Sequence, residues 1–191
     1  MNLRTGPERT VLVDVDGTLC ANIPRLVEYV DERYGVSLAE PDITEWSYPV
    51  EGTDRHVGEL IHDAMADRPE EFLLSMDPLP GAAGAMARLR DHGHEVRIAT
   101  HRPAETHPVT RRWLDDHDVP YDAFVEEVPP DKGALPGDLL VDDYHLNVRN
   151  ALAAGKAGAL FRQPYSDPAA CEGALVADSW RDFLGAVGFE A

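Results

Sequence analysis

The sequence predicts an α/β protein with three layers, in which helices cover both faces of a parallel sheet. Short apolar strands alternate with helices from residue 77 onward, and another apolar strand stands at residues 10–15. Both patterns are typical of parallel sheets, whose strands are joined by helical crossovers. The segment 20–76 carries helical patterns only, so we expect a core of residues 1–19 and 77–191 with a helical cap inserted at 20–76.

Each expected element follows from apolar spacing and from residues that begin or end helices. In the cap, residues 23–35 and 54–67 place apolar side chains on one helical face, and Asp54 is a candidate N-cap. A further turn or two is expected at 69–76. In the core we expect a helix ending near residue 90, strand 95–100, helix 108–118, strand 121–127, strand 137–143, helix 146–155, strand 157–161 and helix 179–188.

Composition excludes several classes of function. The 191 residues carry a formal net charge of −18, from 35 acidic residues against 17 lysines and arginines, with no basic stripe. Since Lys and Arg supply most affinity for polynucleotides and anionic lipids, we expect neither a nucleic acid polymer nor a membrane as partner. The chain shows no membrane-span or signal-peptide pattern, so a cytoplasmic location is expected. Cys20 and Cys171 lack metal-ligand spacing and are expected to be buried thiols.

Polar residues follow three of the expected strands, at the ends where an open α/β sheet binds its ligands. They are Asp14 and Asp16 after the first strand, Thr100 and Arg102 after strand 95–100, and Asp142 and Asp143 in strand 137–143. Lys132 lies in the loop before that last strand. Four carboxylates repel one another unless a hard cation lies among them. Magnesium fits because it prefers oxygen ligands, whereas zinc would recruit His or Cys, which are absent from these positions.

These residue types indicate phosphoryl chemistry. A carboxylate held near phosphorus can act as a nucleophile and form an aspartyl-phosphate, and a second carboxylate two residues on can protonate the leaving alcohol and then activate water. The Thr100 hydroxyl and the Lys132 ammonium would hold the phosphoryl oxygens. The pattern therefore predicts a phosphomonoester hydrolase.

The motifs also resemble a known superfamily. "DVDGT" (14–18), Thr100, Lys132 and "DD" (142–143) look like the four motifs of the haloacid dehalogenase superfamily, which has a Rossmann-like core. "MDPLPGA" (76–82), "GDLLVDD" (137–143) and the insertion after the first motif narrow this resemblance to the 5'(3')-deoxyribonucleotidases, also called cytosolic type C nucleotidases.

The resemblance implies a role for each motif residue. Asp14 would be the nucleophile and Asp16 the acid and base. Magnesium would be bound by the Asp14 carboxylate, the main-chain carbonyl of Asp16 and Asp143, while Asp142 would orient Lys132 or a metal-bound water. The expected substrate is a nucleoside 5'-monophosphate or deoxynucleotide, and because related nucleotidases are often dimers, a homodimer is expected.

Two segments leave the identity of the substrate undetermined. Thr100 is followed by "HRP", where mammalian members tend to carry Ser-Pro, so His101 and Arg102 are candidate substrate-binding residues. In the cap, Trp46 and Tyr48 could stack on a base or pack inside the cap.

The alternative substrates are a sugar phosphate or another phosphorylated metabolite. A polynucleotide 3'-phosphatase shares the core motifs but is disfavoured by the net charge of −18. A non-catalytic binding module is disfavoured because every expected catalytic group is present.

Overall fold

The computed structural model, described here for residues 1–189, contains a six-stranded sheet in the order β5-β4-β1-β6-β7-β8. Every neighbouring pair in this sheet is parallel, which confirms the predicted fold class. The strands are β1 (Thr10–Val13), β4 (Glu95–Ile98), β5 (Ala123–Phe124), β6 (Leu139–Asp142), β7 (Ala157–Phe161) and β8 (Leu175–Ala177). The sequence analysis anticipates the first five of these, whereas the three-residue edge strand β8 is too short to show a period.

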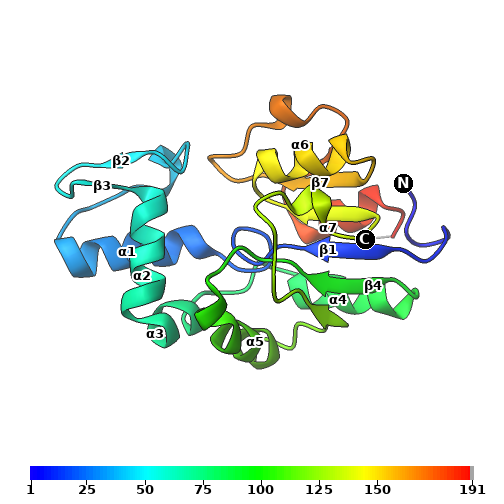
Figure 1. Ribbon diagram of the computed structural model, residues 1–191, viewed down its shortest axis with the longest axis horizontal. Helices are drawn as coiled ribbons and strands as arrows, with labels where there is room; N and C mark the ends of the chain where they lie inside the picture. Colours follow the sequence, from blue (N-terminus) through cyan, green and yellow to red (C-terminus); the bar gives the residue numbers. More distant parts are fainter. Residues whose placement is uncertain (190–191) are drawn as a thin grey trace.

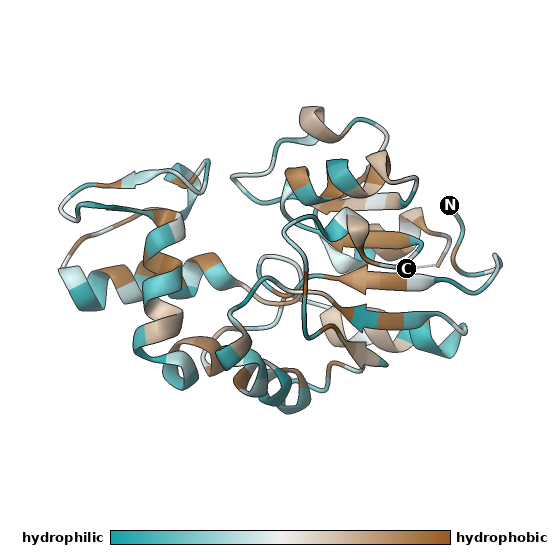
Figure 2. Cartoon of the chain, in the orientation of Figure 1, coloured by the Kyte–Doolittle hydropathy of each residue, from teal (hydrophilic) through white to brown (hydrophobic). Residues whose placement is uncertain are grey.

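Helices cover the two faces of the sheet, and the alternation of β1 assigns its side chains to them. Val11 and Val13 belong to the larger apolar cluster, together with residues of α4 (Ala82–Asp91) and α7 (Trp180–Ala186). Leu12 faces the other layer and packs with Ala151 of α6 (His145–Ala153). Figure 2 shows that hydrophobic and hydrophilic residues alternate along β4 and that hydrophobic residues also occur on the helices. Helix α5 (His107–Asp116) and short 3-10 turns at Ala104–Thr106, Lys132–Ala134 and Pro168–Cys171 complete the core.

Residues 20–76 form an insertion to one side of the sheet (Figure 1). Its elements are α1 (Asn22–Tyr34), a 3-10 turn (Glu40–Asp42), β2 (Pro49–Val50), β3 (Arg55–His56), α2 (Val57–Asp67) and α3 (Pro69–Leu74). The expectation of an all-helical segment is wrong at residues 49–56, where β2 and β3 pair antiparallel. Gly52, with φ of +85°, supplies the left-handed residue of the turn. Helix α2 therefore begins later than expected, with His56 as its N-cap in place of Asp54.

The two connections between the insertion and the sheet run side by side. Ala21 N donates to the Asp77 carbonyl at 2.9 Å, and Leu79 N donates to the Leu19 carbonyl at 2.8 Å. The indole of Trp113 in α5 donates to the Met76 carbonyl at 2.8 Å. The insertion is thus joined to the core directly beside the loop that follows β1. Within residues 1–189, no helix has the length and apolar character needed to cross a membrane.

Candidate active site

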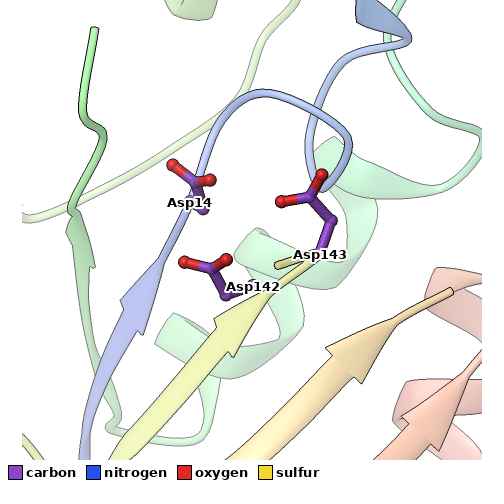
Figure 3. Close-up of side chains that lie close together, drawn as sticks. All are labelled: Asp14, Asp142 and Asp143. Atoms are coloured by element: carbon purple, nitrogen blue, oxygen red, sulfur yellow. The ribbon is translucent and has the colours of Figure 1, made fainter. Parts of the chain in front are cut away.

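Three carboxylates meet where β1 and β6 end (Figure 3). Asp14 follows β1, Asp142 is the last residue of β6, and Asp143 comes next. All three residues are buried, and one oxygen from each lies within 4.8 Å of the others. The parallel pairing of β1 with β6 creates this cluster, because it brings the carboxyl ends of two strands far apart in sequence to the same edge.

Lys132 joins two of these carboxylates. Its Nζ lies 2.8 Å from Asp142 Oδ2 and 2.9 Å from Asp14 Oδ1, and the lysine is 1% exposed. Asp142 Oδ1 also accepts hydrogen bonds from the Tyr144 main-chain N at 2.9 Å and from Asn147 Nδ2 at 3.1 Å. The carboxylate of Asp142 is therefore occupied by donors from the protein and orients Lys132 toward Asp14.

Burial dominates the electrostatics of the cluster. It raises the pKa of Asp14 to about 7, with the neighbouring Asp142 and Asp16 contributing and Lys132 opposing. The pKa of Asp143 is also raised well above its usual range by burial and by Asp142 and Asp14. For Lys132, burial alone would lower the pKa, but the charges of Asp14 and Asp142 outweigh it and raise the pKa. One buried ammonium cannot balance three ionised carboxylates, so the cluster favours either protonation of Asp14 and Asp143 or the binding of a cation.

The donor set fits a hard cation. Asp14 Oδ1 is buried and accepts no hydrogen bond, although Lys132 Nζ lies 2.9 Å away. All three members of the cluster offer carboxylate oxygens and none is a His or Cys, which favours magnesium over zinc. Because the oxygens of Asp142 already accept from Lys132, Tyr144 and Asn147, Asp14 and Asp143 are the side chains best able to bind the ion.

The loop after β7 holds Asp143, a role that the sequence analysis does not anticipate. The Tyr165 hydroxyl donates to Asp143 Oδ2, and the Ser166 hydroxyl donates to the Asp143 carbonyl at 2.7 Å. Gln163 Nε2 donates to the Gly17 carbonyl at 2.8 Å. The sequence does contain a signal for this role. The loop follows the carboxyl end of a parallel strand, which is where open α/β sheets bind their ligands.

Asp16 is not part of the acidic cluster, and its carboxylate is bound by Arg102 instead. Arg102 Nε donates to Asp16 Oδ2 at 2.8 Å, and Arg102 Nη2 donates to Asp16 Oδ1 at 2.7 Å. The Arg102 side chain is 0% exposed, whereas that of Asp16 is 17% exposed. The sequence analysis names Arg102 as a candidate substrate-binding residue, and in the structure its guanidinium is bound to Asp16.

A pocket of about 580 Å³ connects this site with the insertion. Asp14, Asp16 and Thr100 line it on the core side, and Trp46 lines it on the insertion side. Three more of the predicted site residues also line the pocket, namely His101, Arg102 and Asp143. The other three, Lys132, Asp142 and Tyr48, do not line it. Tyr48 is half-buried and packs against the apolar core.

Three of the residues that line the pocket also contact other parts of the protein. The Thr100 hydroxyl accepts from the Arg102 main-chain N at 3.2 Å. His101 Nε2 contacts the Pro129 carbonyl at 2.9 Å, so its ring is held against a neighbouring loop. Trp46 stacks at a tilt on Tyr165, with ring centroids 4.8 Å apart. The insertion thus contacts the same tyrosine that holds Asp143.

Gly17 is expected to be intolerant of any side chain. Its φ is +69°, and a Cβ there would collide with the Asp143 carboxylate and the Tyr165 hydroxyl. We expect Gly17→Ala to lower the free energy of unfolding by about 3 kcal/mol, the sum of backbone strain and overpacking. Gly35 is the matched control, because its φ is +66° and nothing lies within 4 Å of its Cβ position. Urea denaturation of both variants measures the difference, and equal losses would show that the crowding at Gly17 is unimportant.

The sequence is similar to that of a known protein family and of a curated relative. The sequence pattern of the family described as "5' nucleotidase, deoxy (Pyrimidine), cytosolic type C protein" matches residues 8–187. A predicted 5'(3')-deoxyribonucleotidase from Chlorobaculum tepidum is 29% identical over 153 residues, covering 75% of this chain and 73% of that protein.

Solved structures agree on the fold. A haloacid dehalogenase-like hydrolase from Streptococcus pneumoniae is 14% identical with a TM-score of 0.66, covering 94% of this chain and 98% of its own. A haloacid dehalogenase family hydrolase from Deinococcus radiodurans, with bound phosphate and sodium, is 19% identical with a TM-score of 0.66, covering 95% and 97%. The chain therefore belongs to the cytosolic type C 5' nucleotidase family and is a phosphomonoesterase with the haloacid dehalogenase-like fold.

Proposed function

We propose that the protein hydrolyses nucleoside 5'-monophosphates or deoxynucleotides with magnesium, through a phosphoryl group carried on Asp14. The observation that carries the proposal is that Asp14, Asp16 and Trp46 line one and the same pocket. A volume of about 580 Å³ is in the range of small-molecule sites. It leaves room for a phosphate at the carboxylates and for an organic group beside the indole.

In the first step, a carboxylate oxygen of Asp14 attacks phosphorus. The new bond forms between that oxygen and phosphorus, the bond from phosphorus to the ester oxygen breaks, and Asp16 gives its proton to the departing ester oxygen. The nucleoside leaves as a neutral alcohol. Lys132, which lies 2.9 Å from Asp14 Oδ1, and the Thr100 hydroxyl stabilise the phosphoryl oxygens.

In the second step, water regenerates the enzyme. Asp16, now a carboxylate, takes a proton from water while the water oxygen bonds to phosphorus and the bond from phosphorus to Asp14 breaks. Inorganic phosphate leaves, and both aspartates return to their starting forms.

Magnesium, when bound by Asp14, the main-chain carbonyl of Asp16 and Asp143, would neutralise the excess negative charge of the cluster and of the incoming phosphate. The insertion 20–76 would act as a cap on the core formed by 1–19 and 77–191. By covering the pocket it would exclude water and contact the part of the substrate beyond the phosphate.

A panel of phosphomonoesters tests this proposal. We expect purified protein with magnesium to release phosphate from nucleoside monophosphates and p-nitrophenyl phosphate, and EDTA to remove this activity until magnesium is restored. Trp46→Ala should raise KM for nucleotides while leaving KM for ribose 5-phosphate nearly unchanged, because the sugar phosphate has no aromatic ring to stack on the indole.

The panel distinguishes the alternatives. Equal kcat/KM for ribose 5-phosphate and deoxynucleotides would contradict a cap that recognises the base and would indicate a sugar phosphate or another metabolite. No phosphate release from any member of the panel would overturn the proposal as a whole.

A further inference from the structure

Resting on the function proposed above, we infer that Arg102 is a positioning residue that aims the carboxyl group of Asp16 into the pocket for both proton transfers, and that it does not bind the substrate phosphate. A buried arginine beside a proposed phosphate site would ordinarily be read as a phosphate clamp. The contacts of Arg102 indicate otherwise.

The first argument is geometric. The two bonds from Arg102 to Asp16 join Nε with Oδ2 at 2.8 Å and Nη2 with Oδ1 at 2.7 Å, so they engage both oxygens of the carboxylate. Such a paired contact fixes the plane of a carboxyl group as well as its position. Asp16 has only two side-chain torsions, and this clamp determines both.

The second argument is that the guanidinium is held on its other sides. Arg102 Nη1 donates to the Thr110 hydroxyl at 3.2 Å, and Nη2 lies 3.3 Å from both Cys20 Sγ and Met76 Sδ. Cys20 and Met76 stand on the two connections of the insertion, which pack against each other there. Arg102 would lose these contacts if it turned toward a phosphate, and its side chain is 0% exposed.

The third argument is the direction of exposure. Asp16 and Arg102 both line the pocket, but the Asp16 side chain is 17% exposed whereas the Arg102 side chain is 0% exposed. A carboxyl group that must both give and take a proton at a point in the pocket benefits from a fixed orientation. Arg102 therefore acts on the reaction through Asp16.

The leaving group provides the test. p-Nitrophenolate departs as a stable anion and needs no proton, whereas a nucleoside alkoxide does. We expect Arg102→Gln to keep a rapid burst of about one nitrophenolate per enzyme, because Asp14 can still be phosphorylated, and then to slow by about 10²-fold in steady state as water activation fails. Release of nucleoside from a nucleoside monophosphate should slow already in the first turnover. KM for p-nitrophenyl phosphate should fall together with kcat, because hydrolysis of the phosphorylated Asp14 then limits turnover.

Comparison variants make the assignment specific. Asp16→Asn should show the same pattern, and the double variant Arg102→Gln/Asp16→Asn should lose no more activity than Asp16→Asn alone. Arg102→Lys keeps the charge but not the two-point contact, so it should recover only part of the rate.

If Arg102→Gln does not fold, Thr110→Val removes one anchor of the guanidinium and should give a milder form of the same pattern. Thr106→Val, which removes a neighbouring buried hydroxyl without contact to Arg102, is its control.

Several results would overturn the inference. Loss of the nitrophenolate burst together with a raised KM would make Arg102 a phosphate-binding residue. Equal slowing of every step in Arg102→Gln and in Thr106→Val would make its role structural. Failure of the wild-type protein to hydrolyse any ester would instead overturn the proposed function, so the two failures are distinguishable.

Discussion

Replacing Asp14 with asparagine is expected to abolish phosphate release, by about 10⁴-fold or more, which is the scale for loss of a catalytic nucleophile. Asparagine has nearly the same shape, so the buried site should remain packed, but its amide cannot form the covalent bond to phosphorus. Steady-state rates with p-nitrophenyl phosphate and with a nucleoside monophosphate measure the loss. Asp91→Asn, at the exposed end of α4, is the matched control and should retain the wild-type rate.

The same variant should alter how stability depends on pH. Because burial raises the pKa of Asp14 to about 7, the metal-free folded protein holds a proton that the unfolded chain releases near pH 4. The free energy of unfolding therefore falls as pH rises from about 4 to 7, and this contribution is absent in Asp14→Asn. Calorimetry in EDTA should show a smaller decrease in Tm between pH 5.5 and 8 for the variant.

The activity measurement has its own decisive outcome. An Asp14→Asn protein that stays active with all substrates would exclude Asp14 as the nucleophile.

Removing the ammonium of Lys132 is expected to have the largest effect on stability. Lys132→Met leaves Asp14 and Asp142 buried without their cation, and loss of one partner of a buried ion pair costs about 3–5 kcal/mol. Urea denaturation of the metal-free protein measures this loss. It should be greater at pH 8 than at pH 5.5, because burial raises the pKa of Asp14 to about 7, and protonation of Asp14 at the lower pH relieves its repulsion with Asp142.

Two further variants define the origin of that effect. Lys132→Met/Asp142→Asn removes one charge of each sign and should recover much of the stability, while phosphate release stays low because the phosphoryl oxygens lose their cation. Lys156→Met changes the other lysine of the chain, which follows α6 on the partly exposed surface, and should be nearly neutral. A free energy of unfolding for Lys132→Met within about 1 kcal/mol of the wild-type value would contradict a structural role for the ion pair.

Much of the fold is visible in the sequence because it depends on local patterns. The strand at residues 10–15 is a short apolar run, and the acids at its carboxyl end indicate a ligand-binding edge of the sheet. The same rule places Thr100 and Asp143 beside them, since parallel strands end at a common edge. The hairpin of residues 49–56 was missed because two-residue strands have no measurable period, and its turn depends on the left-handed φ of Gly52.

The side-chain partners are the part that sequence patterns did not reveal. Arg102 and Asp16 are 86 positions apart, and nothing in the local spacing distinguishes an arginine that faces a phosphate from one that faces a carboxylate. Tyr165 reaches Asp143 only because the loop after β7 folds back over the end of β6.

Residue types and their order were therefore enough to establish the fold class, the acidic edge of the sheet and the kind of chemistry found there, because these follow from periodicity and from the chemistry of the side chains themselves. The pairing of each acidic side chain with its basic partner does not follow from residue types and their order. It depends on distances of a few ångströms between segments that the chain brings together from far apart, and on the burial that makes each pairing strong. Those distances exist only in the packed protein, where Lys132 lies against Asp14 and Arg102 lies against Asp16.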